Sequence, residues 1–404
     1  MSPPARRIRL MIITTEYHHG LRYRLHHFLP YLVRWFDVKV LSIAPALYDV
    51  DVNDSSLLPQ LAIWIRQVLP HLRTKLIQHH DGNTIVRSFP WSHVFFHRID
   101  MAILAAIFLM LSRLNLGFDV FFASPHMAGL VALLAGLRPL VYDDVDRLTH
   151  FSSNPVKRTI FKTIEGFCIR NASTVVSAGY SLGRSAERIR GGRVEIVPNA
   201  VDASLFKKSE APLSGRLTMI YVGSIEHWSG LEEAIRALAL LQREYSVDAT
   251  LLVVGRGSQQ YVSSLRRISS EEGVEERVEL REPVPYSQLP TVLSNCHLGL
   301  ATFDDSEVSW HAFPFKVLEY MAAGLPLVVS GIKDAAEIVD RFRCGFNVPH
   351  ERRAIADAVY RIVKDEVTYR RMSINAVEGA RKLELGVQAE KLRVIIEGLA
   401  STVK

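Results

Sequence analysis

The sequence predicts an α/β protein with two domains, each a parallel sheet covered by helices on both faces. Short apolar, β-branched runs alternate with helical patterns along all 404 residues, which is typical of parallel sheets. A chain of this length is too long for one ordinary core, so two domains are expected. Its 48% apolar and 22% charged residues indicate a folded chain, not a disordered one.

The predicted strands form two sets separated by a polar segment. The first set is RLMIITT, DVKVLSI, FDVFFAS, PLVYDD, TVVSAG and VEIVPN, and the second is LTMIYVG, ATLLVVG, VELRE, LGLATF and PLVVSG. The segment KKSEAPLSGR between them is polar and contains Pro and Gly, which indicates a boundary. We therefore predict a first domain over residues 1–210, a second over 211–385 and a final helical segment over 386–404. Ligands are expected at the carboxyl ends of the strands.

The segment HAFPFKVLEYMAAGLPLVVS, residues 311–330, is the most informative stretch of the chain. Gly324 and Pro326 end a short helix, and LVVS reads as a strand buried on both faces. A loop that enters a helix N-terminus offers N–H groups and a positive dipole to an anion. Lys316 adds a mobile positive charge, and Glu319 can accept hydrogen bonds from a ribose diol. The segment thus predicts a nucleotide site, against the alternative of a surface Lys and Glu on an amphipathic helix.

The same segment resembles the donor-binding signature of glycosyltransferases of the GT-B fold, specifically the family 4-like enzymes of group 1. Further matches follow in the family's order; they are VPNAVDASLF (197–206), VGSIEHWSGLEEAI (222–235), VVGRGS (253–258) and RVELREPVPYSQL (277–289). The resemblance covers essentially the whole chain. It implies two Rossmann-like domains that face each other across a cleft, with a C-terminal helix that crosses back to the first domain.

This resemblance implies transfer of a sugar from a UDP- or GDP-sugar to a hydroxyl of a glycan or lipid-linked glycan. The family works without a cofactor or metal and with retention of configuration. Fixed cations and N–H dipoles stabilise the leaving diphosphate in such a reaction, and Lys316 is the implied catalytic cation. Glu319 is implied to hold the ribose. The other implied donor-binding residues are Gly20, Gly223, Ser224, Arg256, Glu282, Pro283, Val284, His311, Ala312, Phe313, Pro314 and Phe315.

The chain departs from the family pattern at three positions. His311 stands where many members have the first of two glutamates, and an imidazole can donate, accept or titrate near neutrality. Ser224 and Ser229 stand where many members have an Arg and a Lys that bind the diphosphate. Lys316 is then expected to carry more of the positive charge, together with Arg256.

The first domain is expected to bind the acceptor. Gly20 follows the first strand and allows close approach of a substrate. His126 lies at another strand end, and Asp144 and Asp146 lie at the next one. Because burial of an unpaired carboxylate is costly, carboxylates at a strand end indicate function rather than packing. We predict that Asp144 or Asp146 orients the acceptor or donor hydroxyls, with His126 as a further catalytic candidate.

Several other function classes find little support. In VGRGSQQ, Gln260 stands where a dinucleotide fingerprint needs a third Gly, and the chain has no GxxxxGK[ST] phosphate loop. The glycines of that loop still predict close approach of backbone to a ligand. The net charge of +6 suits acidic partners, but the aromatics are not interleaved with basic clusters, so nucleic acid is not expected. The three cysteines are far apart, as expected for buried thiols of a cytoplasmic protein.

Membrane contact and two rival functions stay open at this stage. The apolar run of residues 101–111 reaches only ~16 Å as a helix, too short for a ~30 Å hydrocarbon core. The basic amphipathic segment of residues 57–80 predicts peripheral contact with the inner face of a membrane, or packing on its own domain. A sugar-nucleotide epimerase and a non-catalytic nucleotide-sugar-binding partner are the two rival functions.

Overall fold

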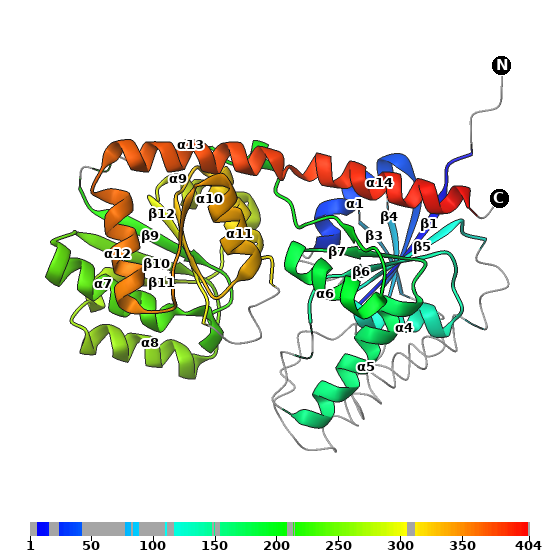
Figure 1. Cartoon of the computed structure of the whole chain (residues 1–404), viewed down its shortest axis with the longest axis horizontal. Helices are drawn as coiled ribbons and strands as arrows, with labels where there is room; N and C mark the ends of the chain where they lie inside the picture. The colour runs from blue at the N-terminus through cyan, green and yellow to red at the C-terminus, as the bar shows by residue number, and fades with distance from the viewer. Residues whose placement is uncertain are drawn as a thin grey trace. The chain divides into compact units, whose positions relative to one another are not determined.

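The computed structural model describes residues 6–15, 24–42, 77–81, 84–88, 110, 117–147, 149, 154–207, 213, 215–304 and 312–402. Within this part of the chain it forms two compact units, shown in Figure 1. Unit 1 comprises residues 1–197 and 389–404, and unit 2 comprises residues 198–388. Among the predicted site residues, Gly20 and His311 lie outside the described residues, as do residues 57–76 of the amphipathic segment.

Unit 1 contains an eight-stranded sheet in the order β3-β4-β2-β1-β5-β6-β7-β8, counted over the described residues. Its strands are β1 (Arg9–Thr14), β2 (Asp37–Ser42), β3 (Ile77–Asp81), β4 (Thr84–Ser88), β5 (Val120–Ser124), β6 (Leu140–Asp144), β7 (Thr174–Ser177) and β8 (Glu195–Ile196). Only the β3–β4 pair is antiparallel. The helices are α1 (Arg24–Trp35), α4 (His126–Leu134), α5 (Pro155–Asn171), α6 (Tyr180–Arg190) and α14 (Leu385–Ser401), of which α14 starts in unit 2.

Unit 2 contains a six-stranded parallel sheet in the order β11-β10-β9-β12-β13-β14 over the described residues. Its strands are β9 (Leu217–Val222), β10 (Ala249–Val254), β11 (Val278–Arg281), β12 (Leu298–Thr302), β13 (Leu327–Ser330) and β14 (Gly345–Asn347). Its helices are α7 (Leu231–Tyr245), α8 (Gln259–Glu271), α9 (Leu289–Ser294), α10 (Phe315–Ala322), α11 (Lys333–Phe342), α12 (Arg352–Val363) and α13 (Glu366–Lys382). From β9, successive strands are added on one side as far as β11 and on the other side from β12 to β14. The switch point of the sheet therefore lies between β9 and β12, and ligands are expected at the carboxyl ends of these two strands.

The strand predictions are confirmed in both units. Each predicted run contains an observed strand, and LVVS forms β13 with all four residues buried. The sequence patterns missed β3, β4 and β14. The β14 strand has only three residues, so it offers too few positions for a pattern.

The domain boundary lies at Val197 rather than after residue 210. Val201 and Phe206 are buried in the same hydrophobic cluster as Ile220 of β9. The Val201 N–H donates to the carbonyl of Leu383, and the Leu385 N–H donates to that of Val201. These contacts bind the segment after Val197 to unit 2, so the boundary precedes the polar segment that suggested residue 210.

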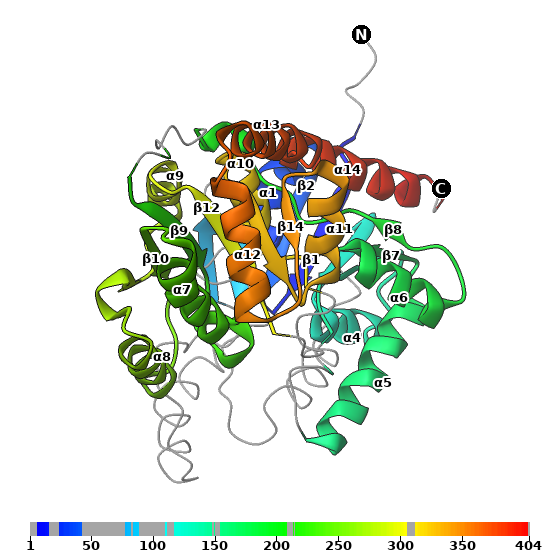
Figure 2. The same ribbon diagram turned by 60° about the vertical axis from the view of Figure 1, so that its left-hand side comes forward.

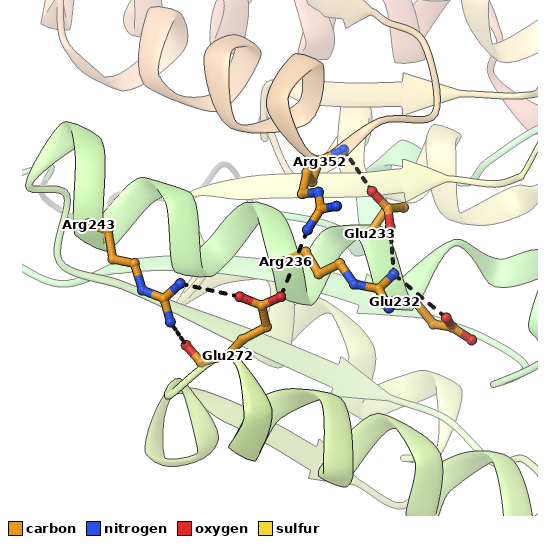
Figure 3. A network of polar contacts seen from close by, with 6 residues as sticks. All are labelled: Glu232, Glu233, Arg236, Arg243, Glu272 and Arg352. Atoms are coloured by element: carbon orange, nitrogen blue, oxygen red, sulfur yellow. Dashed lines mark hydrogen bonds and ion pairs between the residues drawn. The ribbon is translucent and has the colours of Figure 1, made fainter.

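Helices α7 and α12 cover one face of the unit 2 sheet, and a polar network connects them to the end of α8 (Figure 3). Glu233 accepts hydrogen bonds from the Arg352 backbone N–H at 2.9 Å and from Arg236 at 2.6 Å. Arg243 and Arg352 both reach Glu272 beyond the C-terminus of α8, at 3.4 and 3.9 Å. Such exposed pairs contribute little singly, so apolar packing stabilises the layer and the network fixes how the helices lie.

Candidate nucleotide-sugar site

Lys316 lies at the carboxyl ends of β9 and β12, where the sheet order of unit 2 predicts a ligand. Its Nζ lies 3.7 Å from the centre of the Tyr221 ring and 5.0 Å from that of Phe303. A Cβ placed on Gly223 would approach this Nζ to 2.8 Å, so glycine makes room for the ammonium group. Cation–π contact offsets part of the cost of removing the charge from water. The lysine is therefore held at the switch point of the sheet, not at the surface.

Helix α10 begins directly before this lysine. Pro314 is its N-cap and gives no side-chain hydrogen bond to the first turn, which also has no acidic residue. The first N–H groups of the helix and the positive end of its dipole therefore lie beside Lys316. This combination suits a phosphate group, as the sequence predicted.

Glu319 follows one turn later and is also buried, with 6% of its surface exposed. Burial raises the pKa of this carboxyl group to about 7, although a hydrogen bond from Tyr286 and the charge of Lys316 oppose the rise. Burial likewise lowers the pKa of Lys316 to about 7, and Glu319 opposes that shift. Both groups therefore exchange protons near neutrality, where an added anion can change their charge.

Asn199 is a site residue that the sequence patterns missed. Its side-chain amide donates a hydrogen bond of 2.7 Å to the carbonyl oxygen of Phe313, in the loop that precedes α10. Phe313 itself is buried in the hydrophobic cluster of unit 2. Asn199 therefore fixes the loop that aims the α10 N-terminus. Asn199 lies in the motif VPNAVDASLF, and nothing in this local pattern indicates a partner more than a hundred residues away.

Backbone packing requires the glycines of the loop after β10, and the approach of this loop to a ligand stays a prediction. A Cβ on Gly255 would lie 1.8 Å from the Gly223 carbonyl oxygen, and one on Gly257 would lie 2.1 Å from that of Ile225. The Ile225 N–H donates to the Arg256 carbonyl at 2.9 Å. The glycines thus allow the loops after β9 and β10 to pair beyond the strands.

The two serines that replace family cations have structural contacts in this turn. Ser229 is fully buried, and its hydroxyl donates to the Glu226 carbonyl at 2.5 Å. The Ser224 carbonyl accepts a hydrogen bond of 2.7 Å from the Tyr221 hydroxyl. Trp228 stacks on Phe303 with ring centres 5.4 Å apart, which joins the loops after β9 and β12. The turn is therefore held by packing and carries no basic side chain except His227.

Arg256 and Glu282, both predicted donor-binding residues, form an exposed ion pair at 3.3 Å. Their side chains are 78% and 80% exposed, so water screens the pair and it contributes little stability. Pro283 follows directly, and Val284 packs partly buried against the hydrophobic cluster that includes Phe313. Arg256 lies at the carboxyl edge, but Lys316 is the cation held by the core.

Unit 1 places Asp143 and Asp144 at the end of β6 as members of two buried ion pairs. Arg24 contacts Asp143 at 3.0 Å, and the Ser124 hydroxyl donates to the same carboxylate at 3.0 Å. Arg147 contacts Asp144 at 2.5 Å. Burial raises the pKa of Asp144, and Arg147 opposes this shift. The argument that these carboxylates do not serve packing is therefore wrong, because each has a buried arginine partner.

Asp146 differs from Asp143 and Asp144 because the residue as a whole is exposed, although protein atoms surround its carboxyl group. Desolvation by the surrounding protein and then the charge of Asp144 raise its pKa, and Arg147 opposes the rise. Asp144 has no exposed surface, so of the two predicted carboxylates only Asp146 can meet a substrate in this conformation. His126, at the start of α4, is buried with 4% exposed.

A separate recess of about 810 Å³ lies at the amino ends of β1 and β2 in unit 1. Arginines from the start of β1 and the end of α1 line it; they are Arg6, Arg7, Arg9 and Arg34. It lies at the amino ends of the strands, whereas Asp146 lies at their carboxyl ends. Its position therefore gives it no part in the predicted site.

The geometry and the comparisons with known proteins agree on the class of protein. The two α/β units have the GT-B fold: a structure of Anabaena HepE in complex with UDP and glucose aligns with a TM-score of 0.71 and 18% identity, over 97% of this chain and 100% of that one. Residues 202–379 match the family described as glycosyl transferases group 1. This match lies within the second unit, so that part of the chain is similar to the family.

Two curated relatives illustrate the range of the family. Glycogen synthase of Mycobacterium tuberculosis is 25% identical over 217 residues, which cover 52% of this chain and 50% of that protein. The GDP-mannose:cellobiosyl-diphosphopolyprenol alpha-mannosyltransferase of Xanthomonas oryzae is 28% identical over 178 residues, 43% of this chain and 44% of that protein. The chain thus spans about half the length of these relatives.

The buried pair of Arg24 and Asp143 generates a stability prediction. Replacing Arg24 with Met leaves a buried carboxylate without its partner, so the free energy of unfolding of unit 1 should fall by about 3–5 kcal/mol. Arg193→Met provides the control, because this arginine is 82% exposed where it pairs with Glu195, and it should change stability by less than about 1 kcal/mol. Urea unfolding followed by fluorescence measures both free energies of unfolding. Equal losses would contradict the prediction that the buried pair matters more for stability than the exposed one.

Proposed function

We propose that the protein transfers a sugar from a nucleoside-diphosphate sugar to a hydroxyl acceptor. The single observation that supports this most is the buried Lys316 beside the α10 N-terminus, at the switch point of the unit 2 sheet. As the glycosyl phosphate bond breaks, negative charge develops on the leaving diphosphate. A lysine in place before the reaction, together with helix N–H groups, stabilises that charge without reorganisation.

We propose a division of roles between the units. In unit 2, Lys316 binds the diphosphate and Glu319 binds the ribose hydroxyls. The base lies against the backbone of residues 282–284 after β11. In unit 1, the exposed Asp146 accepts a hydrogen bond from the acceptor or sugar hydroxyl, while buried Asp144 and Arg147 hold the segment that carries it. His126 starts the neighbouring helix and positions this edge of the sheet.

The donor is proposed to be a UDP- or GDP-sugar, used without a metal or other cofactor. The Anabaena protein was crystallised with UDP and glucose, and the Xanthomonas relative is named for GDP-mannose, so both bases occur among similar proteins. The name of that relative also contains a lipid-linked acceptor, which supports a glycan or lipid-linked glycan as acceptor here. Retention of the anomeric configuration is carried over from the family resemblance.

The two rival functions make different use of the same site. A sugar-nucleotide epimerase converts the donor with no acceptor present, and a non-catalytic binding partner holds the donor without turnover. Incubation with donor alone, then with an acceptor panel, separates the three. The exposed Asp146 favours a transferase, because a binding partner has no need of a carboxylate at the unit 1 edge.

Substitution of the two central donor contacts tests the proposal. Lys316→Ala should lower kcat/KM for the donor about 10²–10³-fold, because the developing diphosphate charge loses its buried cation. Glu319→Ala should raise the donor KM about tenfold or more through loss of a charge-assisted hydrogen bond. Lys382→Ala and Glu378→Ala, exposed on α13, should leave the kinetics unchanged. Normal donor kinetics in both site variants would contradict the assignment.

Donor binding should take up a proton above neutral pH. Without a ligand, Lys316 has a pKa of about 7, so at pH 8 it is mostly neutral. A bound diphosphate favours the charged ammonium and raises this pKa, so affinity should fall as pH rises above about 7. Titration calorimetry of UDP at pH 8 in buffers of different ionisation enthalpy should show uptake approaching one proton. Lys316→Met should bind UDP weakly and without this uptake; unchanged uptake would place the titration elsewhere.

Asp146→Asn should separate acceptor use from donor binding. The amide retains the size of the side chain but loses the negative charge, so turnover should fall about 10²-fold or more. UDP binding by calorimetry should stay within twofold of the unsubstituted protein, because this residue lies in unit 1. Asp37→Asn, an exposed change at the opposite edge of the same sheet, is the control. Full turnover in Asp146→Asn would remove this residue from the mechanism.

A further inference from the structure

The first half of α5 is exposed along almost its whole length. Residues 154–163 are all exposed except for the half-buried Phe161. The buried residues of this helix all lie in its second half; they are Ile164, Glu165, Gly166, Cys168 and Ile169. Figures 1 and 2 both show the start of α5 projecting away from the sheet. About half of this helix is therefore not held by packing.

Local contacts stabilise the projecting half instead. The Asn154 side chain accepts hydrogen bonds from the N–H groups of Val156 and Lys157 at 2.9 and 3.1 Å, and Pro155 occupies the first turn. An Asn cap and an early Pro both favour helix initiation. The Asn154 cap and Pro155 therefore favour the helix in a segment that packing does not stabilise.

An apolar stripe runs along the exposed side of α5. Val156, Ile160 and Phe167 are spaced by four and seven residues, which places them on one line of a helix. Their exposed fractions are 66%, 37% and 37%. Scattered exposed apolar residues need no explanation, but three aligned on a projecting helix indicate a surface that something covers.

The remaining exposed charges on α5 are all positive. Lys157, Arg158, Lys162 and Arg170 are exposed, and the single acidic residue of the helix, Glu165, is buried. Two copies of such a helix would repel each other. At 100° per residue, Lys157 and Arg170 flank the stripe, and Arg158 and Lys162 lie on the opposite side of the helix. An apolar stripe on a helix whose other sides are basic suits a surface that is anionic outside and apolar beneath.

The position of α5 relates this surface to the candidate site. The helix follows β6, so it starts at the carboxyl edge, where Asp146 lies. A helix of 17 residues is about 25 Å long, whereas the five-residue strand β6 spans about 17 Å. The second half of α5 packs on the unit, so the excess length and the exposed half extend past the carboxyl edge.

We propose that the first half of α5 docks on an anionic phospholipid bilayer. Val156 and Ile160, the part of the stripe in this half, enter the boundary between headgroups and acyl chains. Lys157 beside them contacts lipid phosphates, and Lys162 adds to the positive charge near the surface. For its link to a lipid-linked acceptor this inference rests on the proposed function, because it puts the acceptor edge of unit 1 beside the membrane. None of the described helices is long and apolar enough to cross a bilayer, so the contact is peripheral.

Sedimentation of the full chain with vesicles tests this docking without any sugar transfer. The protein should sediment with vesicles of phosphatidylglycerol and phosphatidylcholine at low salt, and much less with phosphatidylcholine alone. Lys157→Gln with Lys162→Gln should weaken binding about thirty-fold, since each basic residue near an anionic surface contributes about a factor of five. Val156→Gln with Ile160→Gln should weaken it about tenfold or more through lost apolar burial.

Matched variants elsewhere control for charge and apolarity. Arg266→Gln with Arg371→Gln removes two exposed charges from unit 2, and Val367→Gln with Ile374→Gln removes an exposed Val and Ile from α13. Both should bind vesicles normally. The docking proposal is overturned if the unsubstituted chain does not sediment, or if the α5 variants bind like these controls. It is also overturned if the α5 variants change only the oligomeric mass in light scattering, because another protein copy would then cover the stripe.

The outcomes for docking and for sugar transfer are separable. UDP binding should be normal in all α5 variants, because the donor residues lie in unit 2. If vesicle binding depends on α5 while Lys316→Ala keeps normal donor kinetics, the proposed function fails and the membrane surface stands. If Lys316→Ala and Glu319→Ala behave as expected but α5 variants bind vesicles normally, only the docking surface fails.

Discussion

The buried ammonium group of Lys316 imposes the constraint on which the rest of the candidate site depends. A lysine without an anion has a high cost of burial, and burial lowers its pKa to about 7. The rings of Tyr221 and Phe303 offset part of that cost. Tyr221 is in turn fixed through the Ser224 carbonyl, and Phe303 through the stacked Trp228. Much of the local sequence around the β9–β12 switch point thus holds one positive charge ready for a negative ligand.

The packing of the turn after β9 explains why it holds two serines where many family members have cations. A lysine at Ser229 would have to leave the turn, because this side chain is fully buried and bonded to Glu226. A turn closed by Ser229 and by the stack of Trp228 on Phe303 is compact. In the proposed function, such a turn leaves the diphosphate to Lys316 and the α10 N-terminus. With fewer cations in the proposed site, Lys316 contributes more to donor binding. Proton uptake by Lys316 should therefore be a sensitive measure of that binding.

Sequence patterns predicted the two sheets because each buried parallel strand consists of a short apolar run that can be recognised locally. They also predicted the helix that carries Lys316 and Glu319, since Gly324 and Pro326 end it locally. They did not predict Asn199, whose hydrogen-bond partner Phe313 is 114 residues further along the chain, or the arginine partners of Asp143 and Asp144. Pairings between distant residues depend on tertiary structure, and local strand patterns do not indicate them. The domain boundary was misplaced for the same reason, because Val201 and Phe206 join unit 2 through long-range packing.

In the proposed function, the difference between the buried and exposed carboxylates of unit 1 determines how the carboxyl ends of its strands bind an acceptor. Asp143 and Asp144 are paired with arginines and held within the core, so their carboxylates are not accessible to a ligand in this conformation. Asp146, two residues further, is an exposed residue beside that rigid support. A carboxylate that must meet successive hydroxyl acceptors needs both properties, a fixed backbone and an accessible oxygen. The ion pairs that cancel two charges therefore make the third one usable, and the same segment leads directly into α5.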